Sequence, residues 1–322
     1  MPHAAEGVIN KKKPNIQKIT TMKKIIILSV ICLFSIQAFA QNDAQFTQFY
    51  ANRLFHNPAA TGASDKFLAS VTHRTQWIGS AIKNQLPNYT LFSATQYFAE
   101  KRSGVGLTVY NAKHNVQQNL QIKGSYAYHL QVQDEAWLSM GINVGFLRKG
   151  IKDGIPIDGP VWNSESYTMS DLGIGVEYYT PELIVGVSCQ HIPELILGAK
   201  EQRQHVHFYY YTMYFYTINE EWKVIPSVAL RNSSFFTNVD VSARVSYLNM
   251  FQFGLSWRRD AVALLLGFSF QDTYSIGYSF DLHTGNIYGV RPSHEIVLGY
   301  RTQIINAQDT RLQRITTASR DF

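Results

Sequence analysis

The chain has 322 residues, a formal net charge of +6, 16% charged residues and 13% aromatic residues. Few charges beside many aromatics are typical of a surface that faces a medium less polar than water. A mean hydropathy of −0.14 excludes a bundle of transmembrane helices. A transmembrane β-barrel reconciles these values, because every second residue of a spanning strand faces the lumen and stays polar.

The positive charge is concentrated at the start of the chain. Residues 1–40 hold six of the 29 basic residues and one of the 23 acidic residues, which leaves a net charge of +1 for the rest. A nucleic-acid-binding role therefore loses its main support.

The first forty residues also have the pattern of an export signal. Two lysines after Met22 precede an apolar run over 25–36 and an A-x-A site that ends at Ala40. We expect residues 1–40 to be a presequence with a Sec-type signal peptide, a true start at Met22, and cleavage between Ala40 and Gln41. The alternative, a membrane anchor, is disfavoured because the run is shorter than the ~20 residues of a spanning helix.

Beyond Gln41 the main signal is period-2 alternation of large apolar with small or polar residues, interrupted by turn residues. It predicts an all-β fold, a transmembrane antiparallel barrel of about fourteen strands. The predicted strands are 67–80, 88–98, 103–112, 116–131, 135–149, 168–180, 182–192, 205–218, 221–231, 236–247, 250–259, 261–271, 273–284 and 293–303. An even number puts both chain ends on the periplasmic side, and a merged or missed hairpin would make the number twelve or sixteen.

The chain thus divides into the presequence, a segment over 41–66, the barrel over 67–303 and a polar tail over 304–322. The segment 41–66 mixes polar and aromatic residues without alternation, which leaves a periplasmic lead-in and a plug inside the lumen as alternatives. Long connections around 150–167, 193–204 and 284–293 are expected to be extracellular. Two packed soluble sheets are the disfavoured alternative, because they would need fewer aromatics and no regular Gly or Ser opposite them.

Two blocks of sequence near the chain ends go beyond a generic barrel. They comprise Gln45, Phe46, Thr47, Gln48, Asn57, Pro58, Ala59, Gly62, His73, Arg74, Gln76 and Trp77 near the start, and His294, Glu295, Gly299 and Tyr300 near the end. These blocks resemble the PorP/SprF family of the type IX secretion system of Bacteroidetes. Ala44 stands where that family commonly has proline, which is a small departure.

The resemblance implies an outer-membrane component or accessory of type IX secretion in a Gram-negative, Bacteroidetes-like bacterium. Its partners would be periplasmic secretion subunits, a large secreted surface protein similar to a gliding adhesin, or both. The implied activity is protein binding rather than catalysis. A general or ligand-selective diffusion channel is the alternative that barrel size alone supports.

Reactive or metal-binding chemistry has little support in the residues. The histidines are spread over different strands and no serine is tied to them, so a lipid-modifying enzyme is disfavoured. His205 and His207 place two imidazoles on one strand face, but two ligands without further partners are a weak metal signal. Cys189 is the single cysteine after cleavage, which excludes an internal disulfide. We therefore predict no cofactor, no metal, no nucleic acid and no small-molecule substrate.

Charged residues at inward positions are the remaining functional candidates. The alternation places Arg74, Lys123, Glu177, Asp240, Arg244, Arg258 and Arg301 in the lumen. Pairing of acids with bases across a filled interior is favoured over an ion pathway. The aromatic run over 207–216 is interpreted as a strand that crosses both interfacial belts and fills the lumen, in preference to a ring-stacking site.

Overall fold

The computed structural model describes residues 45–80, 86–115, 117–151, 165–193, 205–233, 236–284 and 291–302. The predicted presequence with its cleavage site at Ala40 and Gln41, and the predicted tail 304–322, lie outside the described residues. So do most residues of the three connections predicted to be long. None of the described helices is long and apolar enough to cross a membrane.

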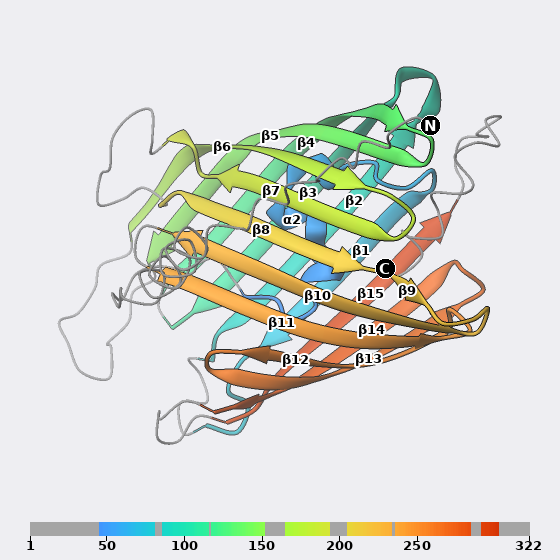
Figure 1. Ribbon diagram of the computed structural model, residues 1–322. Helices are drawn as coiled ribbons and strands as arrows, with labels where there is room; N and C mark the ends of the chain where they lie inside the picture. The colour runs from blue at the N-terminus through green and yellow to red at the C-terminus, as the bar shows by residue number, and fades with distance from the viewer. Residues whose placement is uncertain are drawn as a thin grey trace, which may run out of the picture. The chain divides into compact units, whose positions relative to one another are not determined.

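The described strands form a single antiparallel sheet (Figure 1). They are β1 (Phe67–Thr75), β2 (Asn88–Phe98), β3 (Ser103–His114), β4 (Gln117–Gln133), β5 (Ala136–Ile151), β6 (Glu165–Tyr179), β7 (Leu183–Gln190), β8 (His207–Tyr214), β9 (Tyr216–Thr217), β10 (Trp222–Ser233), β11 (Phe236–Tyr247), β12 (Phe251–Arg258), β13 (Ala261–Phe270), β14 (Tyr274–His283) and β15 (Ser293–Thr302).

The prediction of fourteen strands is confirmed. β8 and β9 both pair with β10, and they are separated only by Phe215, whose N–H donates to the Glu182 carbonyl at 2.7 Å. They therefore occupy one position in the sheet, which has fourteen positions in all.

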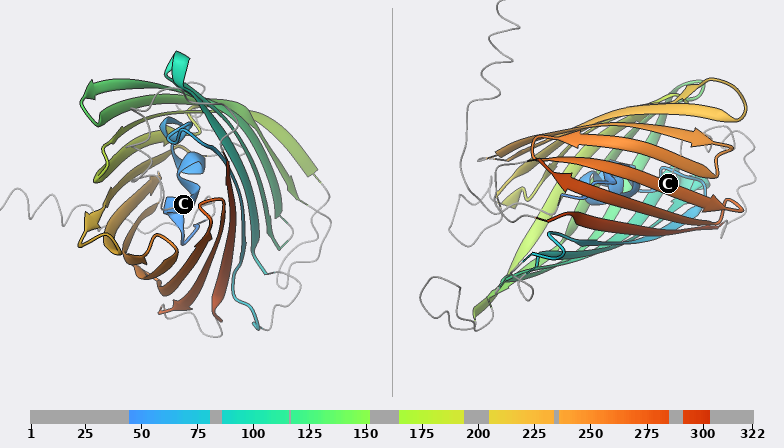
Figure 2. Two further views of the ribbon diagram at one scale, coloured as in Figure 1. Left: turned by 90° about the vertical axis from the view of Figure 1, so that its right-hand side faces the viewer. Right: turned by 90° about the horizontal axis from the view of Figure 1, so that it is seen from below.

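Strands that follow one another in the chain are neighbours in the sheet, and β1 pairs with β15 to close it. The closed ring of strands is seen end-on in Figure 2. Closure leaves no sheet edge, so each backbone N–H and C=O along the ladder has a partner without water. An antiparallel up-and-down barrel is thus the architecture of the described residues.

The two faces of the sheet differ as the alternation predicts. Large apolar side chains point outward, and Val144 and Leu255 are 62% and 61% exposed. Neighbouring positions point inward and are polar and buried, such as Asn143 and Ser256. An apolar outer face and a polar lumen are the arrangement of a membrane-spanning barrel.

Connections on the two ends of the barrel differ in length. On the end that carries the start of β1 and the finish of β15, no connection between successive strand positions exceeds the four residues of Ala99–Arg102 or Ile218–Glu221. The connections over 76–87, 152–164, 191–206 and 284–292 are all on the other end. Short turns beside both chain ends are typical of the periplasmic side of a bacterial barrel.

The first strand is shorter than predicted. The predicted strand 67–80 is wrong at its end, because β1 stops at Thr75 and the backbone of Trp77 is left-handed, with φ of 60°. Gln76 and Trp77 therefore follow the strand instead of belonging to it. By contrast, β5 and β6 extend two and three residues into the predicted loop 150–167.

The segment before β1 lies inside the barrel, where Figures 1 and 2 show it in blue. It contains three short helices, η1 (Phe49–Asn52), α2 (Arg53–His56) and η2 (Pro58–Ala60). One further helix, η3 (Ala99–Lys101), lies in the turn between β2 and β3. We call residues 45–66 the plug.

A glycine in the barrel wall allows the plug to pack closely against it. A Cβ atom on Gly141 of β5 would collide with the backbone of Pro58 and Ala59 in η2. At Gly124 on the neighbouring β4, by contrast, the nearest atom to a Cβ would be the Val144 carbonyl oxygen at 4.0 Å. Contact with the plug thus requires a small residue at position 141 and leaves position 124 unconstrained.

We therefore predict that Gly141→Ala destabilises the plugged barrel by about 1–3 kcal/mol, the usual effect of overpacking. The measurement is the temperature at which the barrel loses its fast migration in unboiled SDS gels. Gly124→Ala is the matched control and is expected to leave that temperature unchanged. Equal effects of the two substitutions would contradict a close contact between plug and wall.

Candidate functional site: the lumenal plug and its contacts

The first turn of the plug is held by one carboxylate. Glu295 of β15 accepts hydrogen bonds from the backbone N–H of Thr47 at 2.7 Å and of Gln48 at 2.9 Å, one on each oxygen. Both residues are buried in the lumen, with exposures of 3% and 0%. Burying a backbone N–H group without an acceptor costs free energy. Glu295 supplies the acceptors that water would supply to an exposed segment.

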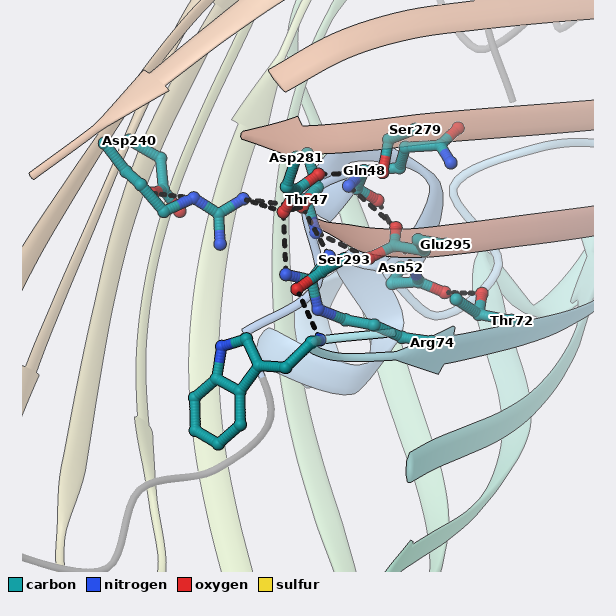
Figure 3. A network of polar contacts seen from close by, with 12 residues as sticks. Thr47, Gln48, Asn52, Thr72, Arg74, Asp240, Ser279, Asp281, Ser293 and Glu295 are labelled. Carbon is teal, nitrogen blue, oxygen red and sulfur yellow. Dashed lines mark hydrogen bonds and ion pairs between the residues drawn. The ribbon is translucent and has the colours of Figure 1, made fainter. Parts of the chain in front are cut away.

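The Thr47 hydroxyl uses its full hydrogen-bonding capacity. It donates to Asp281 at 2.7 Å and accepts from Arg74 at 2.8 Å and from Arg258 at 2.6 Å. One donor and two acceptor positions are all that a hydroxyl has. Figure 3 shows Thr47 beside Asp281 and Arg74, with Glu295 close by. A single plug side chain thus joins three charged groups of the wall.

These charges form a continuous chain across the wall. Arg74 pairs with Asp281 at 2.7 Å and with Glu295 at 3.3 Å. Arg258 pairs with Asp281 at 3.7 Å and with Asp240 at 3.6 Å. Asp240 also pairs with Arg231. We call these six side chains and Thr47 the Thr47 network, which alternates in sign and ties the plug to six strands.

A second anchor lies in the middle of the plug. The Asn57 side-chain amide donates to the Val176 carbonyl and to the Tyr211 hydroxyl oxygen, both at 3.1 Å. Tyr211 in turn donates to Glu177, and Arg53 of the plug lies 3.4 Å from the same carboxylate. Glu177 is fully buried, so its charge is compensated by plug and wall together.

Carbonyl groups of the plug are satisfied by hydroxyl and ring groups of the wall. Ser139 donates to the Ala59 carbonyl and Ser188 to the His56 carbonyl, both at 2.6 Å. His129 lies 2.9 Å from the Thr61 carbonyl. The Gly62 N–H donates to Thr95 at 2.7 Å. The wall therefore provides the partners that regular secondary structure provides elsewhere.

Trp77 lies over the lumen at the end with long connections. Its backbone N–H donates to the Ser293 hydroxyl at 3.3 Å, and its ring lies 6.4 Å from that of His114 and 6.5 Å from that of His283. These side chains come from β3, β14 and β15. The left-handed backbone at Trp77 follows the end of β1, and the ring lies near side chains of β3 and β14.

The residues of the two sequence blocks that resemble the PorP/SprF family, here called the family-motif residues, fall into three groups. Thr47, Gln48, Arg74 and Glu295 meet at one place although they come from the two chain ends. Others belong to the plug or contact it: Gln45, Phe46, Asn57, Pro58, Ala59 and Gly62. The remainder lie elsewhere: Gln76 and Trp77 follow β1, Gly299 is on the inner face of β15, and His73, His294 and Tyr300 are on the outer face.

The seven charged residues that the alternation places in the lumen are all buried, with exposures from 0% to 8%. Arg74, Asp240 and Arg258 meet in the Thr47 network. Lys123 pairs with Asp171 at 3.1 Å. The other three lie apart from these: Glu177 contacts Arg53, Arg244 lies 3.5 Å over the Tyr50 ring, and Arg301 pairs with Asp272 at 3.6 Å.

Sequence reasoning missed several charged residues of the lumen. Asp281 and Arg231 lie at inward strand positions that the alternation gives, although neither is among the seven candidates. Asp171 pairs with His191 at 3.0 Å as well as with Lys123. Arg53 lies in a helical segment, where period-2 alternation does not apply.

The histidines and the aromatic run considered in the sequence analysis do not come together as one site in the described residues. Within the described residues, no group of three or more His, Cys, Asp and Glu side chains could hold a metal ion. His205 precedes β8 and His207 begins it, with the His207 ring 5.3 Å from that of His191. In the aromatic run, Tyr209 and Tyr211 are buried in the lumen whereas Tyr210 and Tyr214 face outward.

We predict that Thr47→Val, which keeps the shape of the side chain, lowers the free energy of unfolding by about 2–4 kcal/mol. Two buried guanidinium groups and Asp281 each lose a hydrogen-bond partner. Thr212→Val on the lipid-facing side of β8 is the matched control. Equal unfolding midpoints in urea for Thr47→Val and the unaltered protein would refute the role given to this hydroxyl.

Comparison with known proteins agrees with this architecture. The profile of the family described as "Type IX secretion system membrane protein PorP/SprF" matches residues 38–300. No curated protein matches the chain. The solved toluene transporter TbuX of Ralstonia pickettii is similar, with TM-score 0.50, 9% identity, and coverage of 84% of this chain and 99% of that chain.

The monoaromatic hydrocarbon channel CymD is also similar, with TM-score 0.51, 11% identity, and coverage of 81% of this chain and 94% of that chain. Similarity at such low sequence identity shows only that these proteins share the barrel fold. The family match confirms the resemblance found in the two end blocks. The chain therefore belongs to the PorP/SprF family of type IX secretion system membrane proteins and is an outer-membrane β-barrel.

Proposed function

We propose that the chain is a non-catalytic component or accessory of type IX secretion that holds a protein partner at the outer membrane. This proposal rests on one observation, which is what the family-motif residues bind in the structure. Thr47, Gln48, Arg74 and Glu295 seat a plug in the lumen and close the sheet. Because the plug lies in the lumen, we assign partner binding to the two ends of the barrel. A signal peptide and a Bacteroidetes-like source are parts of the same proposal.

The partner surface proposed for periplasmic secretion subunits is the end with short turns. Its turns carry exposed acidic residues that project from the rim, among them Glu182 and Glu221. The longer connections on the opposite end would contact a large secreted surface protein. This orientation rests on the rule that bacterial single-chain barrels keep both chain ends and short turns in the periplasm.

Photo-crosslinking in native outer membranes tests the proposal. A photoreactive amino acid at Glu182 or Glu221 is expected to capture type IX secretion subunits of the periplasm. The same amino acid at Arg259 or Asp260, in the turn between β12 and β13 on the opposite end, is the control and is expected to miss them. Capture of no secretion subunit and no secreted protein from either end would sink the proposal.

Conductance measurements distinguish the alternative function, a diffusion channel, from the proposed docking component. The buried contacts of the plug support a low conductance for the intact protein, because the plug occupies the lumen at the level of the Thr47 network. We expect few or no stable openings in planar bilayers. Large, persistent conductance from unaltered protein would favour the channel over the docking component.

A further inference from the structure

Two cations stand out on the lipid-facing side of the barrel. Among the outward-facing strand residues that the structure describes, histidines apart, only Lys113 of β3 and Arg148 of β5 carry a formal charge. Both side chains are exposed, and both lie near the finish of their strands, on the end of the barrel with long connections. A lipid-facing cation costs several kcal/mol at the bilayer midplane and little near the interfaces.

The apolar residues below these cations mark the depth of the hydrocarbon. On β5 every outward position from Leu138 to Phe146 is apolar, and Arg148 is the next outward residue. That stretch rises about 20 Å across the membrane, at ~3.4 Å per residue and a tilt of about 40°. On β3 the apolar outward residues end at Val109, four residues before Lys113. Both cations therefore lie just beyond the apolar band, at the level of the lipid headgroups.

The strand register brings the two cations close together. β3, β4 and β5 are neighbours in the sheet (Figure 1). Lys113 pairs with Gln118 of β4, and Arg148 pairs with Leu120, two residues further along the same strand. With strands ~4.8 Å apart and a rise of ~3.4 Å per residue, the two Cα atoms are about 12 Å apart. Side chains as long as these can both reach one lipid headgroup.

Neutral polar side chains surround the cations. Gln118 is directly opposite Lys113, and Thr168 of β6 is directly opposite Arg148. Arg148 also donates to the Ser166 hydroxyl at 3.2 Å. Neither cation has an ion pair with an acid within the described part of the chain. We call these five residues the outer basic patch.

The same level of the barrel is apolar on other strands. Trp257, Val262 and Leu282 are paired in one row across β12, β13 and β14, and they are the outward residues nearest that end of their strands. All three are exposed. Positive charge on the outward strand positions described here is therefore confined to one side of the barrel, and a cationic girdle around the whole barrel does not explain it.

We propose that the outer basic patch binds a phosphorylated glycolipid of the outer leaflet. Lys113 and Arg148 bind phosphate, because charge-assisted hydrogen bonds to phosphate are strong. The amide of Gln118 and the hydroxyls of Ser166 and Thr168 bind sugar hydroxyls, since each can donate and accept. The acyl chains then lie along the apolar outward residues of β4 and β5.

The chemistry of the patch favours this lipid over others. A zwitterionic phospholipid has no net charge to attract two cations, and an anionic phospholipid without sugar leaves the neutral polar groups unused. The outer leaflet follows from the orientation that keeps both chain ends and the short turns in the periplasm. The site is independent of the proposed docking role, because it lies on the lipid-facing side and not on either end of the barrel.

The test is native mass spectrometry of the purified, delipidated full-length protein in detergent, with one lipid added at a time. The probes are diphosphoryl lipid A, the same lipid without its phosphates, and phosphatidylglycerol. We expect diphosphoryl lipid A to bind and its phosphate-free form to bind about tenfold or more weakly, the usual effect of losing a charged hydrogen-bond partner. Phosphatidylglycerol is expected to bind more weakly than diphosphoryl lipid A.

Variants assign the binding to the patch. Lys113→Gln combined with Arg148→Gln is expected to weaken diphosphoryl lipid A about tenfold or more. Arg259→Gln removes an exposed arginine from the turn between β12 and β13 on the same end and is the matched control, with unchanged affinity expected.

The comparison of lipids on the unaltered protein holds even if the double variant folds poorly. Equal binding of the phosphate-free lipid would overturn the role of the cations, and equal binding of phosphatidylglycerol would overturn the choice of a glycolipid. Full affinity in the folded double variant, or the same loss in Arg259→Gln, would overturn the assignment to this patch.

Discussion

The pairing of the first strand with the last is the constraint on which the other features depend. In that pairing Arg74 of β1 lies directly opposite Glu295 of β15, and both point into the lumen. A slip of one residue would turn either charge toward lipid, where a charged side chain costs several kcal/mol. The buried charges thus select one closing register. The same carboxylate holds the first turn of the plug, so closure of the sheet and seating of the plug depend on one residue.

The polar inner wall has a structural use that differs from that of an open pore. In a water-filled barrel the inward Ser, Thr, His and Glu side chains would be hydrated. Here many of them bind main-chain groups of the plug, as Ser139, Ser188 and Glu295 do. The plug has only three short helices, and the ends of a helix leave backbone groups without partners inside the helix. The lumen therefore acts as a binding surface for an irregular peptide, and its polarity matches the peptide's unpaired groups.

Much of the barrel could be predicted from the sequence, because lipid on one face and a polar lumen on the other impose strict alternation. β2 and β11 have the predicted bounds 88–98 and 236–247. The end of β1 could not be predicted, since the turn at Trp77 depends on contacts with β15. Inward charges followed from alternation, but their partners did not: Arg74 meets Asp281 from 207 residues away. The plug lacks periodicity, so the sequence left its place between lumen and periplasm open.

The distance along the chain between Thr47 and Glu295, 248 residues, has a consequence for assembly. The plug is synthesised before any strand, yet its acceptor is on the last one. Until β15 is added, the plug's first turn has no carboxylate to bind, and the entropy of so long a loop opposes early contact. The first turn of the plug can therefore bind its carboxylate only once β15 is in place. A barrel truncated before β15 would be open at its seam and would also lack the carboxylate for the plug's first turn, while Asn57 and Arg53 would keep their contacts with β6 and β8.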